Sequence, residues 1–186
     1  ITTCRDCPIA DCDTRAVAGE GPSQAPLIIV GEQPGDQEDV AGRPFVGPAG
    51  QLLDDHLVHA GIDRRTAYVT NAVKHFKFTW KGKHRLHQSP TAKEIDTCRW
   101  WLDAERAIVR PRIVLALGAS AARGLLGRTV SVTRERGRAI PLDDSTELWV
   151  TVHPSYLLRL EGAARDEQAA LFAADLAMVR ERLGAD

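Results

Sequence analysis

The sequence predicts an α/β protein with three layers, in which helices cover both faces of a central, mostly parallel sheet of four strands. Short apolar runs rich in β-branched residues recur along the chain, and segments with helical periodicity lie between them. Such alternation is typical of parallel strands joined by crossover helices. The chain has 186 residues, of which 44% are hydrophobic and 26% charged, so we expect one domain over residues 1–186 with a full core.

The first strand is expected at residues 27–30, after an irregular, cysteine-bearing lead-in over residues 1–26. Gly31 ends this apolar run. A helix is predicted over residues 48–60, because its apolar side chains recur on one face and Gly61 suits the position that follows a helix C-terminus.

The later elements continue the alternation. Thr91 and Glu94 lie three residues apart and form a capping-box signature at the start of a long helix. Residues 74–90 are basic and contain Gly82 and Pro90, so we expect a loop there. The other expected elements are strands at 68–73, 113–117 and 148–152, helices at 91–109, 118–126 and 166–183, and an irregular or hairpin-like stretch at 128–144.

Polar turns follow the predicted strands, and three of them carry reactive side chains: Glu32, Asn71 and His153. Because the carboxyl ends of parallel strands meet at one edge of a sheet, we expect these side chains to converge there. A carboxylate, an amide and an imidazole at one crevice form a candidate catalytic set, with Gln33 and Asp36 at its mouth. Taken singly, Asn71 is also a common turn residue, and a lone histidine is more often structural.

A second turn, at residues 42–48, places Phe45 between a proline and two glycines. A ring in so glycine-rich a loop is either a plug of the hydrophobic core or a stacking platform for a flat ligand. Residue statistics alone favour the plug, since most aromatic side chains are simply buried.

The charge of the chain is unevenly distributed. The net charge is −1, which predicts no polyanionic partner. Residues 64–93, however, contain eight Lys or Arg and no Asp or Glu, and Phe76, Phe78 and Trp80 are interleaved with them. Cationic and aromatic side chains together suit unpaired nucleic-acid bases, whereas a solvated surface loop is the ordinary explanation of a charge run.

The four cysteines are Cys4, Cys7, Cys12 and Cys98. No apolar run approaches the roughly 20 residues that span a bilayer, and we expect no signal peptide, no membrane association and no disulfides. The spacing of Cys4 and Cys7 makes them candidates for a metal or cluster site.

Three separated motifs, in order, resemble one known family. GEQPGDQED with GRPFVGPAG, then TNAVKHFKF, then VHPS are similar to the iron–sulfur uracil-DNA glycosylases of family 4, and most of all to the UdgX type, whose members become covalently joined to uracil-containing DNA. A distinctive loop supports the likeness: residues 83–87 read KHRLH, where the UdgX type usually has KRRIH. The loop departs at His84 and Leu86 and retains His87.

The resemblance implies the uracil-DNA glycosylase fold and a set of roles. Asn71 would read the uracil edge, Phe45 would stack on the extruded base, His153 would stabilise the leaving uracil, and Glu32 would lie near the sugar. The resemblance also implies two wider sets: substrate contacts from Gly31, Gln33, Asp36, Arg85 and Ser155, and DNA contacts from Lys83, His84, Arg85 and Arg159. From charge type and family position, we also expect Asp36, Asp39 and Arg85 to hold the loop against the first motif by charge pairing.

The same resemblance implies that His87 attacks the sugar C1′ and stays bonded to it, which would make the enzyme single-turnover in DNA repair. Two other functions stay open: an ordinary uracil-DNA glycosylase with turnover, and a module that binds uracil or single strands without catalysis. The expected partner is uracil-containing DNA, with single strands favoured and double strands left open. We expect a monomer in the bacterial cytoplasm, associated with the nucleoid.

The family also implies a 4Fe–4S cluster, held by Cys4, Cys7, Cys98 and His75, since His75 occupies the position of the family's third cysteine. Spacing alone would favour Cys12 as that ligand, because ligation by four cysteines is the commoner chemistry. A zinc site is the remaining alternative.

Overall fold

The computed structural model describes residues 4–12, 14–143 and 145–185, and its centre is a sheet of five strands in the order β2-β1-β5-β7-β6. The first four strands are parallel: β2 (Ala67–Asn71), β1 (Leu27–Gly31), β5 (Ile113–Leu117) and β7 (Glu147–Thr151). The short edge strand β6 (Ile140–Pro141) is antiparallel to β7 and adds a fifth strand to the four predicted.

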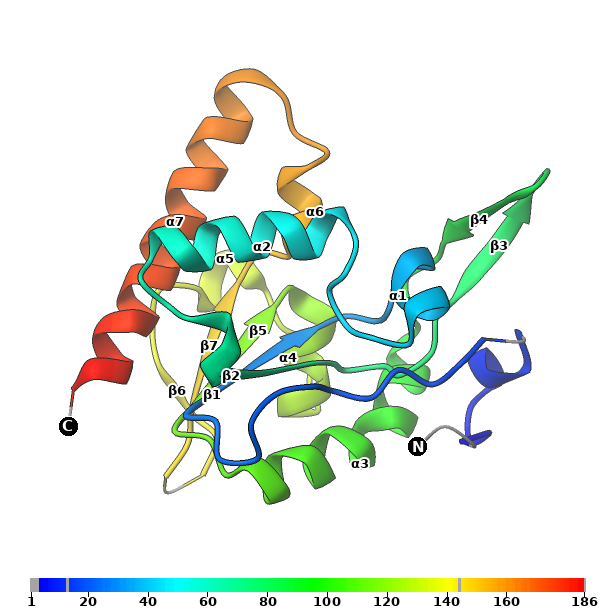
Figure 1. Ribbon diagram of the computed structural model, residues 1–186, viewed down its shortest axis with the longest axis horizontal. Helices are drawn as coiled ribbons and strands as arrows, with labels where there is room; N and C mark the ends of the chain where they lie inside the picture. Colours follow the sequence, from blue (N-terminus) through cyan, green and yellow to red (C-terminus); the bar gives the residue numbers. More distant parts are fainter. Residues whose placement is uncertain (1–3, 13, 144, 186) are drawn as a thin grey trace.

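Alternate residues of β1 face two separate cores, which produces the three layers. Leu27 and Ile29 pack in one core with side chains of α2 (Pro48–His59) and α7 (Gly162–Gly184). Ile28 and Val30 pack in the other with side chains of α3 (Ala92–Val109) and α4 (Ala119–Leu126). Figure 1 shows the helices of these two sets on opposite sides of the sheet. The predicted α/β/α architecture is therefore confirmed.

Local signals place several helix ends as expected. The Thr91 hydroxyl accepts a hydrogen bond from the Glu94 amide and the Glu94 side chain reaches back to Thr91, which completes the predicted capping box of α3. Gly61 follows α2 with a positive φ of 71°, a conformation that glycine adopts without strain. Helix α7 begins at Gly162, four residues before the predicted start.

The predicted loop at residues 74–90 is wrong in its centre. Strands β3 (Phe78–Lys81) and β4 (His84–His87) pair there as an antiparallel hairpin that projects from the body of the molecule (Figure 1). Gly82 has a positive φ of 62° at the first position of a two-residue turn, a standard hairpin geometry.

Short elements occupy other segments that were expected to be irregular. The structure has helix α5 (Val132–Glu135) and strand β6 within residues 128–144, and helix α1 (Asp36–Ala41) in the turn after β1. The remaining short elements are η1 (Pro8–Cys12), η2 (Arg64–Thr66) and α6 (Pro154–Leu157). None of the helices in the described ranges is long and apolar enough to cross a bilayer.

Candidate active site

A cavity of about 780 Å³ opens where the parallel strands end. Glu32 follows β1, Asn71 ends β2, and His153 follows β7, and all three line the cavity together with Phe45 and His87. This position, outside the carboxyl ends of the strands, is where open α/β sheets bind ligands. The structure thus brings together the three side chains that the polar turns predicted to converge.

The Glu32 carboxylate lies between two partners. Its Oε2 accepts a hydrogen bond of 2.5 Å from the Ser120 hydroxyl, and its Oε1 lies 3.3 Å from Nε2 of His87. Burial raises the pKa of Glu32, but the hydrogen bonds with His87 and Ser120 outweigh it, so the pKa lies below its usual value. Glu32 is therefore an anion that faces the His87 imidazole at the cavity mouth.

His153 is neutral and has a fixed tautomer. Its desolvated position lowers the pKa to about 4. Its Nδ1 accepts a hydrogen bond of 3.1 Å from the Ser155 amide, so the single proton of the neutral ring is carried on Nε2. His153 therefore offers an N–H donor, and not a cation, to a ligand in the cavity.

Phe45 and Asn71 meet across Gly31. A Cβ atom at Gly31 would collide with the Asn71 amide oxygen and with the Phe45 ring, so only glycine permits this approach. Phe45 has a positive φ of 54°, which is unusual for a bulky residue and typical of strain held at a functional site. The Phe45 ring packs in the hydrophobic core and also stacks with the His153 ring, with 5.9 Å between the ring centroids. It therefore both fills the core and lines the cavity.

Arg85 and Asp36 lie beside the cavity and do not line it. The Arg85 guanidinium forms 2.5 Å ion pairs with Asp36 and Asp39 of α1, and it lies over the rings of Phe76 and Phe78 at 5.3 and 5.2 Å. This group of contacts ties the hairpin to α1. The charge pairing expected for Arg85, Asp36 and Asp39 is therefore present, and it holds the hairpin that carries His87.

Gln33 holds the base of the same hairpin. Its amide nitrogen donates to the carbonyl oxygens of Lys77 and Gln88, and its amide oxygen accepts from the Lys77 backbone N–H. Lys77 and Gln88 lie on either side of the β3–β4 pair. Gln33 lines the cavity, but its polar atoms are committed to this bridge.

The expected DNA contacts are dispersed. Arg159 lines the cavity, as does the expected substrate contact Ser155, whereas Lys83 and His84 are exposed on the hairpin. Five of the eight basic residues of the strip are already neutralised by acids that lie outside it: Arg64 by Asp54, Arg65 by Asp63, Lys74 by Glu105, Lys77 by Glu94, and Arg85 by Asp36 and Asp39.

Cys4, Cys7 and Cys98 have free thiols, and Cys7 and Cys98 belong to one small apolar core. Desolvation raises the pKa of Cys98 to about 11 in the protein without metal, and the neighbouring Cys7 and Cys4 thiols add to the rise. His75 is 1% exposed, and its Nε2 is buried without a hydrogen-bond partner. The side chain of Cys12 lies outside the described residues.

Within the described ranges, no three His, Cys, Asp or Glu side chains converge closely enough to hold a single metal ion. A 4Fe–4S cluster binds each ligand through a different iron, so its ligands need not converge on one atom. A buried imidazole without a hydrogen-bond partner and three cysteines with free thiols have the donor chemistry that such a cluster requires. These residues fit a cluster on that ground.

Two residues that the sequence did not single out help to build the site. Ser120 reaches Glu32 from the start of α4, which follows the neighbouring strand β5. Glu38 accepts hydrogen bonds from the amides of Gly35 and Gly47, and so links the turn before α1 to the start of α2. For Ser120 the available signal was its position in a polar turn after a strand, like those of Asn71 and His153.

Comparison with known proteins agrees with this architecture. Residues 18–177 match the family model described as the uracil DNA glycosylase superfamily. The chain is 38% identical over 160 residues to the type-4 uracil-DNA glycosylase of Thermotoga maritima, with 86% of this chain and 80% of the relative covered. It is 36% identical over 187 residues to that of Pyrobaculum aerophilum, with 96% and 88% covered. The chain therefore belongs to the uracil-DNA glycosylase superfamily.

Proposed function

We propose that this protein removes uracil from DNA and then captures the exposed sugar on His87. The observation that carries the proposal is the 3.3 Å contact between Glu32 Oε1 and His87 Nε2 at the mouth of a cavity that also holds Asn71 and His153. The similar type-4 proteins are named for uracil-DNA glycosylase activity, which supports the base-removal half of the proposal.

The cavity suits an extruded uracil. The Asn71 amide is 2% exposed and lines the cavity, so its oxygen is available to accept the uracil N3–H while its nitrogen donates to O4. Phe45 provides an aromatic surface for the flat base. The base must leave the duplex stack to reach this depth, because the glycosidic bond is inaccessible inside a helix.

Bond cleavage places negative charge on the departing base. As the bond between C1′ and N1 breaks, its electron pair moves to uracil. His153, neutral and protonated on Nε2, donates a hydrogen bond to uracil O2 and stabilises this charge without giving up its proton. A donor that is already in position needs no reorganisation during the reaction.

Capture follows from the placement of His87. One imidazole nitrogen supplies its lone pair to C1′, which forms a C–N bond and leaves positive charge on the ring. The adjacent Glu32 carboxylate stabilises that charge. The proximity of a fixed imidazole favours it over water, and the alkylated histidine has no easy route to release. The protein would act once.

We propose further that Cys4, Cys7, His75 and Cys98 hold a 4Fe–4S cluster with a structural role. The free thiols and the unpartnered His75 Nε2 support this ligand set. A cluster at this position would join the lead-in to α3, which carries Cys98. The likeness to the UdgX type, a monomeric state, a single-stranded substrate and a location at the bacterial nucleoid stay predictions.

The test is a denaturing gel after incubation with uracil-containing DNA, with His87→Ser and the matched His84→Ser. The unmodified protein should give a shifted covalent band. His87→Ser should lose that band and release uracil with turnover, because water can then reach C1′, while His84→Ser should keep the band. An alkali-labile abasic product from the unmodified protein would indicate ordinary turnover, and no product would indicate binding alone.

A further inference from the structure

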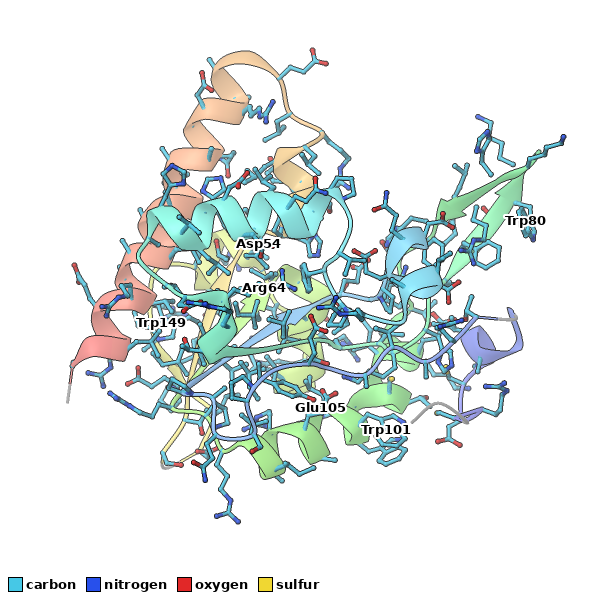
Figure 2. The ribbon with its side chains drawn as sticks, viewed as in Figure 1. Asp54, Arg64, Trp80, Trp101, Glu105 and Trp149 are labelled. Atoms are coloured by element: carbon cyan, nitrogen blue, oxygen red, sulfur yellow. The ribbon has the colours of Figure 1, made fainter. Side chains whose placement is uncertain are left out.

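The β3–β4 hairpin carries an exposed aromatic side chain at its outer end. Trp80 is 66% exposed, and the only ring it packs against among the described residues is Phe78, which it meets edge-on at 5.3 Å. The preceding aromatics lie progressively deeper, since Phe78 is partly buried and Phe76 is 1% exposed. Figure 2 shows Trp80 on the projecting hairpin, away from the body of the protein.

Unpaired positive charge lies at the same place. Lys74, Lys77 and Arg85 of the basic strip are neutralised by acidic partners. Lys81 ends β3 and Lys83 is the second residue of the hairpin turn, and among the described residues neither forms an ion pair. The packing of the chain therefore leaves two unpaired cations at the tip of the hairpin, next to the exposed indole in sequence.

The strand register connects this surface to the candidate active site. Phe78 pairs with His87, and Trp80 pairs with Arg85 two residues further along. Directly paired residues project from the same face of a hairpin, and so do residues two apart, so Trp80 shares a face with His87. Phe78 is the residue opposite His87, and Trp80 lies two residues, or about 7 Å, further along β3 at about 3.4 Å per residue.

We propose that the tip of this hairpin, with Trp80 on the His87 face and Lys81 and Lys83 at the turn, binds the unpaired nucleotides that flank the uracil. An unpaired base stacks on the indole, and the two ammonium groups contact phosphates. This inference rests on the proposed function, because the hairpin can reach the flank only when His87 faces the sugar. Stacking on Trp80 needs a base with a free face, so the surface selects single-stranded or frayed DNA over closed duplex.

Binding to a fluorescent, uracil-free oligothymidylate tests the proposal by anisotropy. Trp80→Ala should weaken binding by about five-fold or more, and Trp80→Phe should recover most of it, because phenylalanine keeps a stacking surface. Trp100→Ala is the matched control, since Trp100 is a half-exposed indole on α3, and it should bind as the unmodified protein does. Thermal unfolding of each variant shows whether the fold is kept.

A salt titration separates stacking from charge. The double variant Lys81→Gln, Lys83→Gln should reduce the slope of log affinity against log salt by about 1.4, while Trp80→Ala should leave the slope unchanged. Equal affinity of Trp80→Ala and the unmodified protein for the oligonucleotide would overturn the proposal. An equal loss on closed duplex would also overturn it, because it would show a contact that does not need an unpaired base.

Reaction with uracil-containing substrates tests nucleotide binding by the hairpin separately from uracil removal and capture. The adduct yield of Trp80→Ala should fall relative to the unmodified protein as the single-stranded flank is lengthened on one side of the uracil. If the unmodified protein reacts but the relative adduct yield of Trp80→Ala does not change with flank length on either side, the hairpin proposal is wrong and the proposed function is unaffected. Should the unmodified protein neither excise uracil nor form an adduct, the proposed function itself fails.

Discussion

Ser120 shows how one side chain far away in the sequence sets the state of a reactive group. Its hydroxyl donates to Glu32 Oε2 across 88 residues of sequence, while His87 faces the other carboxylate oxygen. A hydrogen bond to a charged group is worth roughly 1.5–3 kcal/mol, more than one between neutral groups. Ser120 therefore both orients the carboxylate and keeps it ionised in a partly buried position.

At the residue scale, Ser120→Ala should slow adduct formation about ten-fold at neutral pH and move the acid limb of its pH profile to higher pH. The pKa of Glu32 is lowered partly by the Ser120 hydrogen bond, so its removal raises that pKa. The anionic form is then lost at a higher pH as the solution is acidified. Single-turnover rates between pH 4 and 8 measure both effects.

Ser120→Thr is the control for this prediction, since threonine keeps the hydroxyl and should restore the position of the limb. A uniform loss of rate in Ser120→Ala, with the profile unmoved, would contradict the assignment. It would indicate that Ser120 affects the site only through packing of α4.

The β3–β4 hairpin is the element that brings His87 to the cavity. Two separate contacts fix it: Arg85 is held by α1, and Gln33 bridges the backbone of Lys77 and Gln88 at its base. A two-stranded hairpin is only marginally stable alone, so these contacts decide whether β4 is ordered beside the cavity. The His87 side chain is half-exposed, so little packing of its own holds it in place. Its position therefore depends on the contacts of Arg85 and Gln33.

At the element scale, Gln33→Ala should loosen the hairpin and slow the capture of the sugar. The change removes both donations to backbone carbonyls and leaves the Lys77 amide unsatisfied, at about 1–3 kcal/mol for a buried group. Hydrogen exchange should rise in the backbone amides of β4, and the adduct rate should fall about ten-fold.

Gln88→Ala is the comparison, because the Gln88 backbone takes part in the bridge with Gln33, while its side chain makes one exposed hydrogen bond of 3.3 Å to the Thr79 hydroxyl. It should change hydrogen exchange and adduct rate much less. If Gln33→Ala leaves the exchange of β4 unchanged, the bridge does not hold the hairpin.

A buried ion pair connects three parts of the whole molecule. Lys74 Nζ, fully buried, donates to Glu105 of α3 at 2.7 Å, to the Thr70 hydroxyl and to the carbonyl oxygen of Asn71. The other Glu105 oxygen accepts from the Gly19 amide of the lead-in. The pair therefore links the end of β2, and with it the Asn71 backbone, to a helix and to the N-terminal segment.

At the scale of the whole molecule, Lys74→Met should lower the free energy of unfolding by roughly 3–5 kcal/mol, because it leaves the Glu105 carboxylate buried without its cation. Chemical denaturation measures the loss. Adding Glu105→Leu to Lys74→Met should recover part of it by removing the unpaired charge. A Lys74→Met protein within about 1 kcal/mol of the unmodified one would show that water or another cation reaches Glu105.

The proposed cluster gives a second prediction at this scale. Protein purified without air should be brown, and Cys98→Ala should lose the colour and most of the bound iron, and should unfold at a lower temperature. Cys12→Ala should keep the colour if His75 is the fourth ligand. Stoichiometric zinc in a colourless unmodified protein would contradict the cluster.

Sequence patterns were sufficient to predict the layers and the edge of the sheet at which the cavity lies. The run from Leu27 to Val30 is apolar throughout, which is what a strand buried on both faces requires, and the structure buries all of it. The Thr91 capping box is a local interaction, so its residues specify it directly. Glu32, Asn71 and His153 were predicted to converge because parallel strands that end in polar turns share an edge.

The tertiary structure alone decided the contacts between distant segments. The β3–β4 hairpin was missed because its polar residues read as a loop. The pairing of Arg85 with Asp36 and Asp39, 49 and 46 residues earlier, was expected from the family resemblance and not from any local pattern. The same packing determined which lysines of the basic strip are neutralised, and it brought Ser120 to Glu32. Such pairings follow from how the elements pack on the sheet, and no local pattern of residues encodes them.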